Sequence, residues 1–195
     1  MRITKKLLND LYIRKQMSAA QIAIKLKYSI SGINYWLKKF NIQKRPISEA
    51  IYLKHNPDGD PFTFNTPKNI KDAKLFGLGI GLYWGEGTKA NKNTVRIGNS
   101  DVNVLKIFIE FLEKFFGINR GWLRFQLHLF SDLDTKIAEK YWMRELKINK
   151  NQLYKTIVTK SGLLGTYRHK SEYGVMTLYY GNTKLRNILV ETLPK

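Results

Sequence analysis

The sequence predicts an α+β protein of two domains: a basic N-terminal domain of three helices, and a larger C-terminal domain that combines helices with a sheet. Three observations predict this class. The chain has 195 residues and is 43% hydrophobic, enough for two small cores. Residues 56–67 hold three prolines and a glycine, which mark a break between domains. Before the break apolar residues recur at helical spacing, whereas helical and alternating stretches both follow it.

The charge of the chain points to nucleic acid as the partner. Lys and Arg number 34 against 15 Asp and Glu, a net charge of +19. Residues 1–56 alone hold 12 basic and 2 acidic side chains, a net +10. Cationic surfaces gain free energy by releasing counterions from DNA or RNA. The alternatives are a protein that is merely basic and one that binds membrane surfaces, but no basic amphipathic helix beside a lipid-anchor motif supports the second.

Composition excludes several other classes. The chain has no cysteine, which rules out disulfides and thiolate zinc sites. His55, His128 and His169 lie too far apart in sequence for a local metal motif. The first ten residues lack the apolar segment of a signal peptide, and no apolar run reaches the ~20 residues of a membrane span. We therefore expect a cytoplasmic protein, associated with the nucleoid if its source is prokaryotic.

Residues 1–56 are expected to form a helix-turn-helix domain. Helices are predicted over residues 4–16, 18–26 and 29–40. Ser18 and Gln21 form a capping box for the second helix, and Ser29 or Ser31 caps the third. The side chains predicted to face inward are Leu7, Leu8, Leu11, Tyr12, Ile22, Ala23, Leu26, Ile33, Trp36, Leu37 and Ile42.

The string "MSAAQIAIKLKYSISGINYWLKKFNI" resembles the helix-turn-helix units of resolvases and small transcription regulators, over about residues 4–46. The resemblance implies DNA binding by the exposed face of the third helix; the alternative is a three-helix bundle without a ligand. Residues on this face that suit base edges are Ser31, Asn34, Tyr35 and Lys38, and those that suit phosphates are Lys39, Lys44 and Arg45.

The segment "LFGLGIGLYWGEGTK", residues 75–89, is rich in glycine. A phosphate-binding loop is disfavoured because no strand precedes it and no Gly-Lys-Ser/Thr triplet ends it, and the segment is too short to span a membrane. A helix fits better. Gly77, Gly81 and Gly85 recur every four residues and share one face, which lets another helix backbone approach closely. Asp72 suits the first turn of this helix.

Within that segment, "GIGLYWGEG", residues 79–87, resembles the LAGLIDADG signature of homing endonucleases. Gly81 and Leu82 match its central Gly-Leu pair. Gly85 stands for the small residue before the acid, Glu86 for the acid and Gly87 for the closing glycine. The chain departs from the signature in three places. Gly79 replaces the first leucine, Trp84 replaces the inner aspartate, and the metal-binding acid is a glutamate.

The resemblance implies how a domain over residues 68–195 would work, with 57–67 as a linker before it. It implies a mostly antiparallel, saddle-shaped sheet that lies in the major groove, and two motif helices that pack together from two subunits or two repeats. Their terminal acids, here Glu86, would bind Mg²⁺ or Mn²⁺ and cut both DNA strands, because hard cations take oxygen ligands and activate water. By analogy with family lysines, Lys155 or Lys160 would lie near the scissile phosphate.

We expect a homodimer that forms through Gly77, Gly81 and Gly85. Two stretches, "NSDVNVLKIFIEFL" and "YGNTKLRNILVETL", share a loose pattern that hints at an internal duplication. The second half has no glycine-rich acidic motif. The alternative is a pseudosymmetric monomer with a single acid. A further alternative for Glu86 is a purely structural ion pair with Lys89.

The rest of the C-terminal domain alternates helices and strands. Strands are predicted over residues 94–98, 122–130, 153–160 and 173–180, and helices over 101–116, 135–146 and 182–193. Along 122–130 the predicted core side chains are Leu123, Phe125, Leu127 and Leu129. On 135–146 they are Ile137, Ala138, Tyr141, Trp142 and Leu146.

The opposite face of the 122–130 strand carries Arg124, Gln126 and His128. This row is either an ordinary solvated sheet face or a base-reading surface, because Arg and Gln form paired hydrogen bonds with guanine and adenine. Further candidate DNA contacts are Arg96, Arg168 and Lys170.

Together these features favour a metal-dependent, sequence-specific endonuclease of double-stranded DNA. The alternative is a non-catalytic transcription regulator on the same scaffold, which the single acid per chain and the neighbouring Trp84 leave open. A resolvase or transposase regulator ranks third, because neither a serine-nucleophile motif nor an acidic triad is evident.

Overall fold

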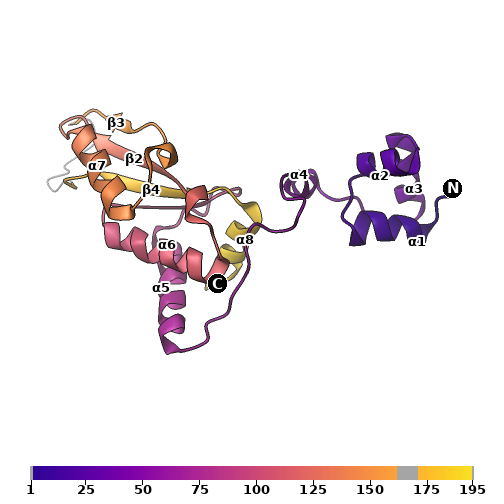
Figure 1. The fold of residues 1–195 in the computed structure, drawn as a ribbon, viewed down its shortest axis with the longest axis horizontal. Coiled ribbons are helices and arrows are strands. Elements are labelled where there is room, and N and C mark those ends of the chain that lie inside the picture. Colours follow the sequence, from indigo (N-terminus) through magenta and orange to yellow (C-terminus); the bar gives the residue numbers. More distant parts are fainter. Residues whose placement is uncertain (1, 162–170, 195) are drawn as a thin grey trace. The chain divides into compact units, whose positions relative to one another are not determined.

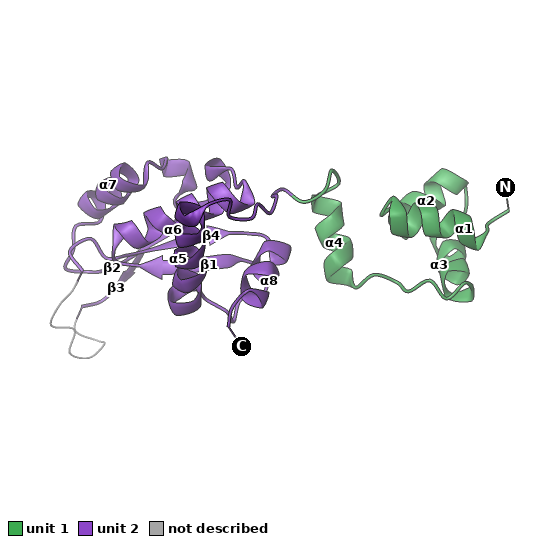
Figure 2. Ribbon diagram, turned by 90° about the horizontal axis from the view of Figure 1, so that it is seen from below, with its two compact units in different colours: residues 1–60 green, residues 61–195 purple. Residues whose placement is uncertain are grey.

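The computed structural model describes residues 2–161 and 171–194. The chain divides into two compact units, residues 1–60 and 61–195 (Figure 2). The described residues form eight α-helices and one four-stranded mixed sheet, an α+β architecture. No helix among them is long and apolar enough to cross a membrane.

Three helical segments build the core of the first unit, which also contains a fourth helix (Figure 1). They are α1 (Lys5–Leu8), which runs on into a π-helical segment η1 (Asn9–Arg14), then α2 (Ala19–Leu26) and α3 (Ile30–Lys39). The predicted capping box is confirmed: the Gln21 backbone N–H donates to Ser18 Oγ at 3.1 Å, and the Ser18 N–H donates to Gln21 Oε1 at 2.8 Å. Ser29, rather than Ser31, caps α3 by accepting from the Gly32 N–H. Local capping thus sets both helix starts.

The core of the first unit agrees with the predicted helical faces. Its buried members are Ile3, Leu8, Leu11, Tyr12, Ile22, Ala23, Ile33, Leu37 and Ile42. Leu26 and Trp36 are only partly buried against this core. Helix α4 (Ile47–His55) was not predicted and buries none of its side chains. Its apolar residues do not define a narrow face, so the sequence offered no strong helical period.

The second unit is built on one sheet (Figure 1). Its elements are α5 (Ile70–Glu86), β1 (Val95–Asn99), α6 (Val102–Phe116), β2 (Arg124–Phe130), α7 (Thr135–Leu146), β3 (Ile157–Thr159), β4 (Val175–Tyr180) and α8 (Thr183–Glu191), with 3-10 turns η2 (Arg120–Trp122) and η3 (Lys150–Gln152). The strand order is β1-β4-β2-β3. Strand β4 is antiparallel to both β1 and β2, whereas β3 is parallel to β2 across the α7 connection.

One face of this sheet holds the core. The alternation predicted along β2 is confirmed, because Leu123, Phe125, Leu127 and Leu129 are all buried. Helix α6 contributes the largest share of the helical core, mainly through phenylalanines. On α7 the buried stripe is Ala138, Trp142 and Leu146. Ile137 was predicted to face inward and is 61% exposed. It lies one residue, about 100° around the helix, from that stripe.

The segment that connects the units is not a free linker over its whole predicted length. Phe62 is buried in the core of the second unit. The backbone N–H groups of Thr63 and Asn65 donate to the carbonyls of Phe116 and Phe115, at 3.1 and 2.8 Å. Residues 61–65 therefore belong to the second unit. The prolines around Phe62 predict a loop, but burial of the Phe62 side chain holds this segment against the second unit.

Candidate nucleic-acid interface

The glycine-rich segment is helical, as predicted. The side chain of Asn69 begins α5 by accepting from the Asp72 backbone N–H at 2.9 Å. Asp72 in turn accepts from the Lys68 N–H at 3.1 Å and from Lys114 Nζ at 2.6 Å. The hydrogen bond from Lys114 is the main cause that lowers the pKa of Asp72. These bonds fix the start of the helix against α6.

The glycine stripe faces outward. A Cβ added at Gly77, Gly81 or Gly85 would meet no atom within 4 Å. Close packing within the chain occurs at Gly79 instead, where an added Cβ would lie within 3.0 Å of three ring atoms of Phe111. An internal partner for the stripe is therefore absent among the described residues. Gly79, where the sequence departs from the resembled signature, is therefore a position at which the fold of one chain requires glycine.

Apolar side chains flank the bare stripe. Leu78 is 53% exposed and Trp84 is 56% exposed on the same helix. A helix face of this kind, without side chains along its centre and apolar at its edges, is typical of a surface that another protein chain covers.

Glu86 lies where the motif helix meets the sheet. It is the last residue of α5 and is exposed. The next residue, Gly87, forms an antiparallel bridge with Ile97 of β1, and the Thr88 N–H donates to the Arg96 carbonyl at 2.9 Å. A side chain at Gly87 would overlap the carbonyl and ring of Tyr83, so only glycine allows this turn. The chain thus passes directly from the acid onto the edge of the sheet.

The described residues leave the carboxylate of Glu86 without an ion pair. Lys89, the partner in the structural alternative, donates from its ammonium group to the Trp84 carbonyl instead. The loop after Glu86 is held by α8, because Arg186 donates to the carbonyls of Lys89 and Asn91. Sequence reasoning missed this role of Arg186, since the residues lie more than ninety positions apart.

One chain does not assemble the predicted catalytic group. Lys155 and Lys160 flank the three-residue β3 rather than lying within a longer strand. Strand β3 is one edge of the sheet, and β1, beside which Glu86 lies, is the other. Three strand spacings separate these edges, about 14 Å. The structure therefore does not bring either lysine to Glu86 of the same chain.

Glu86 is not part of an acidic or histidine cluster among the described residues. The exposed carboxylate of Glu86 has the chemistry that a hard divalent cation prefers. However, residues 2–161 and 171–194 contain no cluster of three or more His, Asp and Glu side chains able to hold a metal.

The face of the sheet opposite the core carries a polar row. Its members on β2 are the predicted Arg124, Gln126 and His128, all partly exposed. Arg96 of β1 lies with its guanidinium 5.1 Å from the ring centroid of Tyr179 on β4. Sequence reasoning missed Tyr179, because only the strand pairing places it beside β2.

His128 is not a free cation on this face. Its Nε2 is buried and has no hydrogen-bond partner among the described residues. Burial lowers the pKa of His128, and the charge of Arg96 lowers it further. The imidazole is therefore neutral at neutral pH and does not contribute positive charge toward phosphate.

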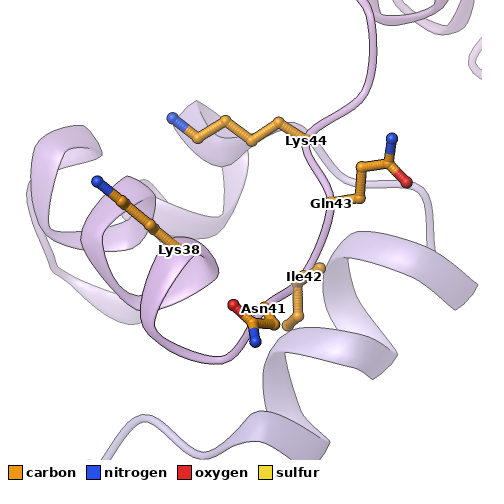
Figure 3. Close-up of a pocket in the computed structure, with 5 residues that line it drawn as sticks. All are labelled: Lys38, Asn41, Ile42, Gln43 and Lys44. Atoms are coloured by element: carbon orange, nitrogen blue, oxygen red, sulfur yellow. The ribbon is translucent and has the colours of Figure 1, made fainter.

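In the first unit, most of the predicted contact face of α3 is open to solvent. Ser31, Tyr35 and Lys38 are exposed, and Asn34 is half-buried. Just beyond α3 lies an open hollow of about 440 Å³ lined by Lys38, Asn41, Ile42, Gln43 and Lys44. Figure 3 shows the side chains of Lys38 and Lys44 extending to the same side of this hollow. Lys39 is exposed, with its ammonium 4.8 Å from the Trp36 ring centroid.

Arg45 was predicted to contact phosphate, but in the structure its side chain packs within the first unit. Its side chain is only 10% exposed. The guanidinium lies 4.4 Å from the ring centroid of Tyr12 and donates to the carbonyls of Tyr12 and Gln16. It also forms an ion pair with Glu49 at 3.7 Å. Arg45 closes the three-helix unit. Arg168 and Lys170, two other candidates, lie outside the described residues.

Comparisons of this chain with protein-family models, with curated proteins and with solved structures found no match.

Proposed function

We propose that this protein is a divalent-metal-dependent endonuclease that binds double-stranded DNA at a specific site as a homodimer. One observation carries the proposal. The only carboxylate of the glycine-rich motif, Glu86, lies where an uncovered helix face meets the edge of a sheet with a basic, polar row. It supports the proposal because a carboxylate able to bind a metal ion would then lie beside a basic surface able to bind DNA.

The bare stripe of α5 supports a homodimer. Each glycine in a helix interior costs roughly 0.5–1 kcal/mol relative to alanine, and in one chain no close packing at the stripe offsets that cost. A second copy of α5 on the stripe would offset it. It would also bring two Glu86 side chains together, which supplies the second carboxylate that one chain lacks.

The two Glu86 carboxylates and DNA phosphate oxygens would then hold Mg²⁺ or Mn²⁺ with oxygen ligands alone. When bound, such an ion activates a water molecule and stabilises the leaving oxygen of a phosphodiester. Recognition would come from Arg96, Arg124 and Gln126 on the sheet, and from the exposed face of α3 in the first unit.

A second candidate is a DNA-binding regulator without catalysis. It is favoured by a specific observation: within one chain, Lys155 and Lys160 lie at the sheet edge opposite to Glu86. On this alternative the α5 face still forms the dimer and the sheet still binds DNA, but no phosphodiester is cut.

The test is to incubate the protein with a library of random duplexes in Mg²⁺, in Mn²⁺ and in EDTA, and to sequence new ends. Glu86→Gln keeps the shape but removes the charge, and cleavage should fall by orders of magnitude while DNA binding survives. Glu110→Gln, which changes an exposed glutamate of α6, is the matched control and should cut normally. Metal-dependent cutting that persists in Glu86→Gln would refute the role of Glu86. No cutting by the wild-type protein, with intact binding, would favour the regulator.

A further inference from the structure

The side-chain amide of Gln126 is held from both sides. Its Oε1 accepts from the hydroxyl of Tyr179 at 3.1 Å. Its Nε2 donates to the backbone carbonyl of Lys155 at 3.1 Å. Tyr179 lies on β4 and Lys155 just before β3, which flank β2 on opposite sides. The amide is therefore hydrogen-bonded to residues on both sides of β2.

These two partners also fix which way the amide points. A backbone carbonyl has no proton to give, so the atom that faces Lys155 O must be the nitrogen. Oε1 then faces Tyr179, and the hydroxyl must act as the donor. A flipped amide would set two acceptors against each other at Lys155. The chemistry of the two partners therefore determines the orientation of the amide.

The network leaves a defined part of the amide free. A glutamine amide has two N–H donors and two acceptor lone pairs, and one of each is used. Because the partners come from the strands on either side of β2, the free lone pair of Oε1 and the free N–H of Nε2 form one edge of the amide. That edge offers one donor beside one acceptor. Adenine presents the complementary pair in the major groove, the N7 acceptor beside the N6 amino donor.

We infer that Gln126 reads an adenine in the major groove, and that Tyr179 is a positioning residue that holds its amide ready. This inference rests on the proposed binding of duplex DNA by the sheet. Tyr179 is itself held, since Arg96 lies over its ring and Tyr154 packs edge-on against it with ring centroids 5.7 Å apart. An amide fixed before binding loses little rotamer freedom on contact, which favours discrimination between bases.

The test selects bound sites from a random duplex library, with binding rather than cleavage as the readout. The full-length wild-type protein is compared with Gln126→Ala, Tyr179→Phe and Tyr154→Phe. The last is a matched control. It removes a hydroxyl from the ring next to Tyr179, but from one that forms no hydrogen bond with a described residue.

Wild-type sites should carry an adenine whose replacement weakens binding roughly 10- to 100-fold. Gln126→Ala should abolish the preference at that position alone. Tyr179→Phe should reduce it at the same position, while Tyr154→Phe leaves it unchanged. Because Tyr179→Phe retains the ring and its packing, it still tests the inference if Gln126→Ala folds poorly.

The inference and the proposed function fail in different ways. If the wild-type protein selects a site but Gln126→Ala keeps every base preference, the reading of adenine is overturned and duplex binding stands. Equal loss of preference at all positions would also overturn it, since that indicates a general weakening. If the wild-type protein enriches no duplex, the proposed function fails, and the inference fails with it.

Discussion

Gly79 on α5 is in direct contact with Phe111 on α6, so closely that the site has no room for a methyl group. Two residues further along the same helix, Gly81 faces open space. The two glycines therefore differ in whether packing within one chain requires them. Gly79 serves the fold of a single chain, whereas nothing among the described residues of one chain requires a glycine at position 81.

Matched alanine substitutions should separate these roles. Gly79→Ala should lower the free energy of unfolding by about 1–3 kcal/mol or more, because the methyl group overpacks the Phe111 contact. Gly81→Ala in the monomer should raise it by roughly 0.5–1 kcal/mol through helix propensity. Urea denaturation at low protein concentration measures both. Equal effects at the two positions would mean that the packing at Gly79 is wrongly described.

A larger side chain at Gly81 should prevent self-association without unfolding the chain. In Gly81→Leu the new side chain points into open space in one chain but would block a second copy of α5. Analytical ultracentrifugation should show a dimer for the wild-type protein and a folded monomer for the variant. A wild-type monomer at high concentration, or a variant that dimerises normally, would contradict the proposed interface.

Arg45 and Lys44 are neighbours with predicted effects of different kinds. Arg45→Ala removes the guanidinium that bonds to Tyr12 and Gln16, and should destabilise the first unit by about 1–3 kcal/mol. Lys44→Ala should leave the melting temperature unchanged but weaken DNA binding and flatten its log–log salt dependence by about 0.9 per lost phosphate contact. Calorimetry and binding titrations from low to moderate salt distinguish the two. An unchanged melting temperature in Arg45→Ala would show that its buried contacts contribute little.

The C-terminal unit should need its first residues. A fragment of residues 61–195 keeps Phe62 in the core and the backbone hydrogen bonds to α6. A fragment of 68–195 loses them and should be less stable by about 2 kcal/mol or more, since burial of a Phe side chain alone is worth 1.5–3 kcal/mol. The midpoints of urea denaturation of the two fragments are compared, and Phe62→Ala in the longer fragment is the control. Equal midpoints would show that residues 61–67 do not stabilise the C-terminal unit and belong to the linker.

Acid should weaken the contact between α5 and α6. The pKa of Asp72 is lowered from 3.8 in the folded state, mainly by the hydrogen bond from Lys114. A lowered folded pKa means that the unfolded chain binds protons more readily. The bond between Asp72 and Lys114 therefore contributes its full stabilisation above the pKa that Asp72 has in the unfolded chain. This stabilisation is lost as the pH falls from that value toward the pKa of Asp72 in the folded chain. Asp72→Asn should flatten the stability curve in this acidic range; a curve that still matches the wild type would exclude the ion pair as its cause.

Local patterns determined much of the fold. The Ser18–Gln21 capping box, the strict alternation along β2 and the helical period of the α5 to α8 segments each depend on residues within a few positions of one another. Such signals can be read without the fold. Helix α4 escaped prediction because it has no buried face. The strand predicted over residues 153–160 is shorter in the structure, because only Ile157–Thr159 forms continuous pairing and Leu153 is joined to β2 by a single isolated bridge to Phe125.

Tertiary contacts decided the candidate interface. The sequence identified Glu86 and the glycine stripe. Only the fold shows that Gly79 packs inside while Gly81 faces out, because the two lie on opposed sides of a helix whose partner is distant in sequence. In the same way, Arg45 looks in the sequence like any basic residue that follows a helix, and only the fold shows that its guanidinium is bound by the carbonyls of Tyr12 and Gln16. Gln126 was visible as one polar residue in an alternating strand. Its fixed amide depends on Tyr179 and Lys155, which strand pairing brings from 53 and 29 residues away.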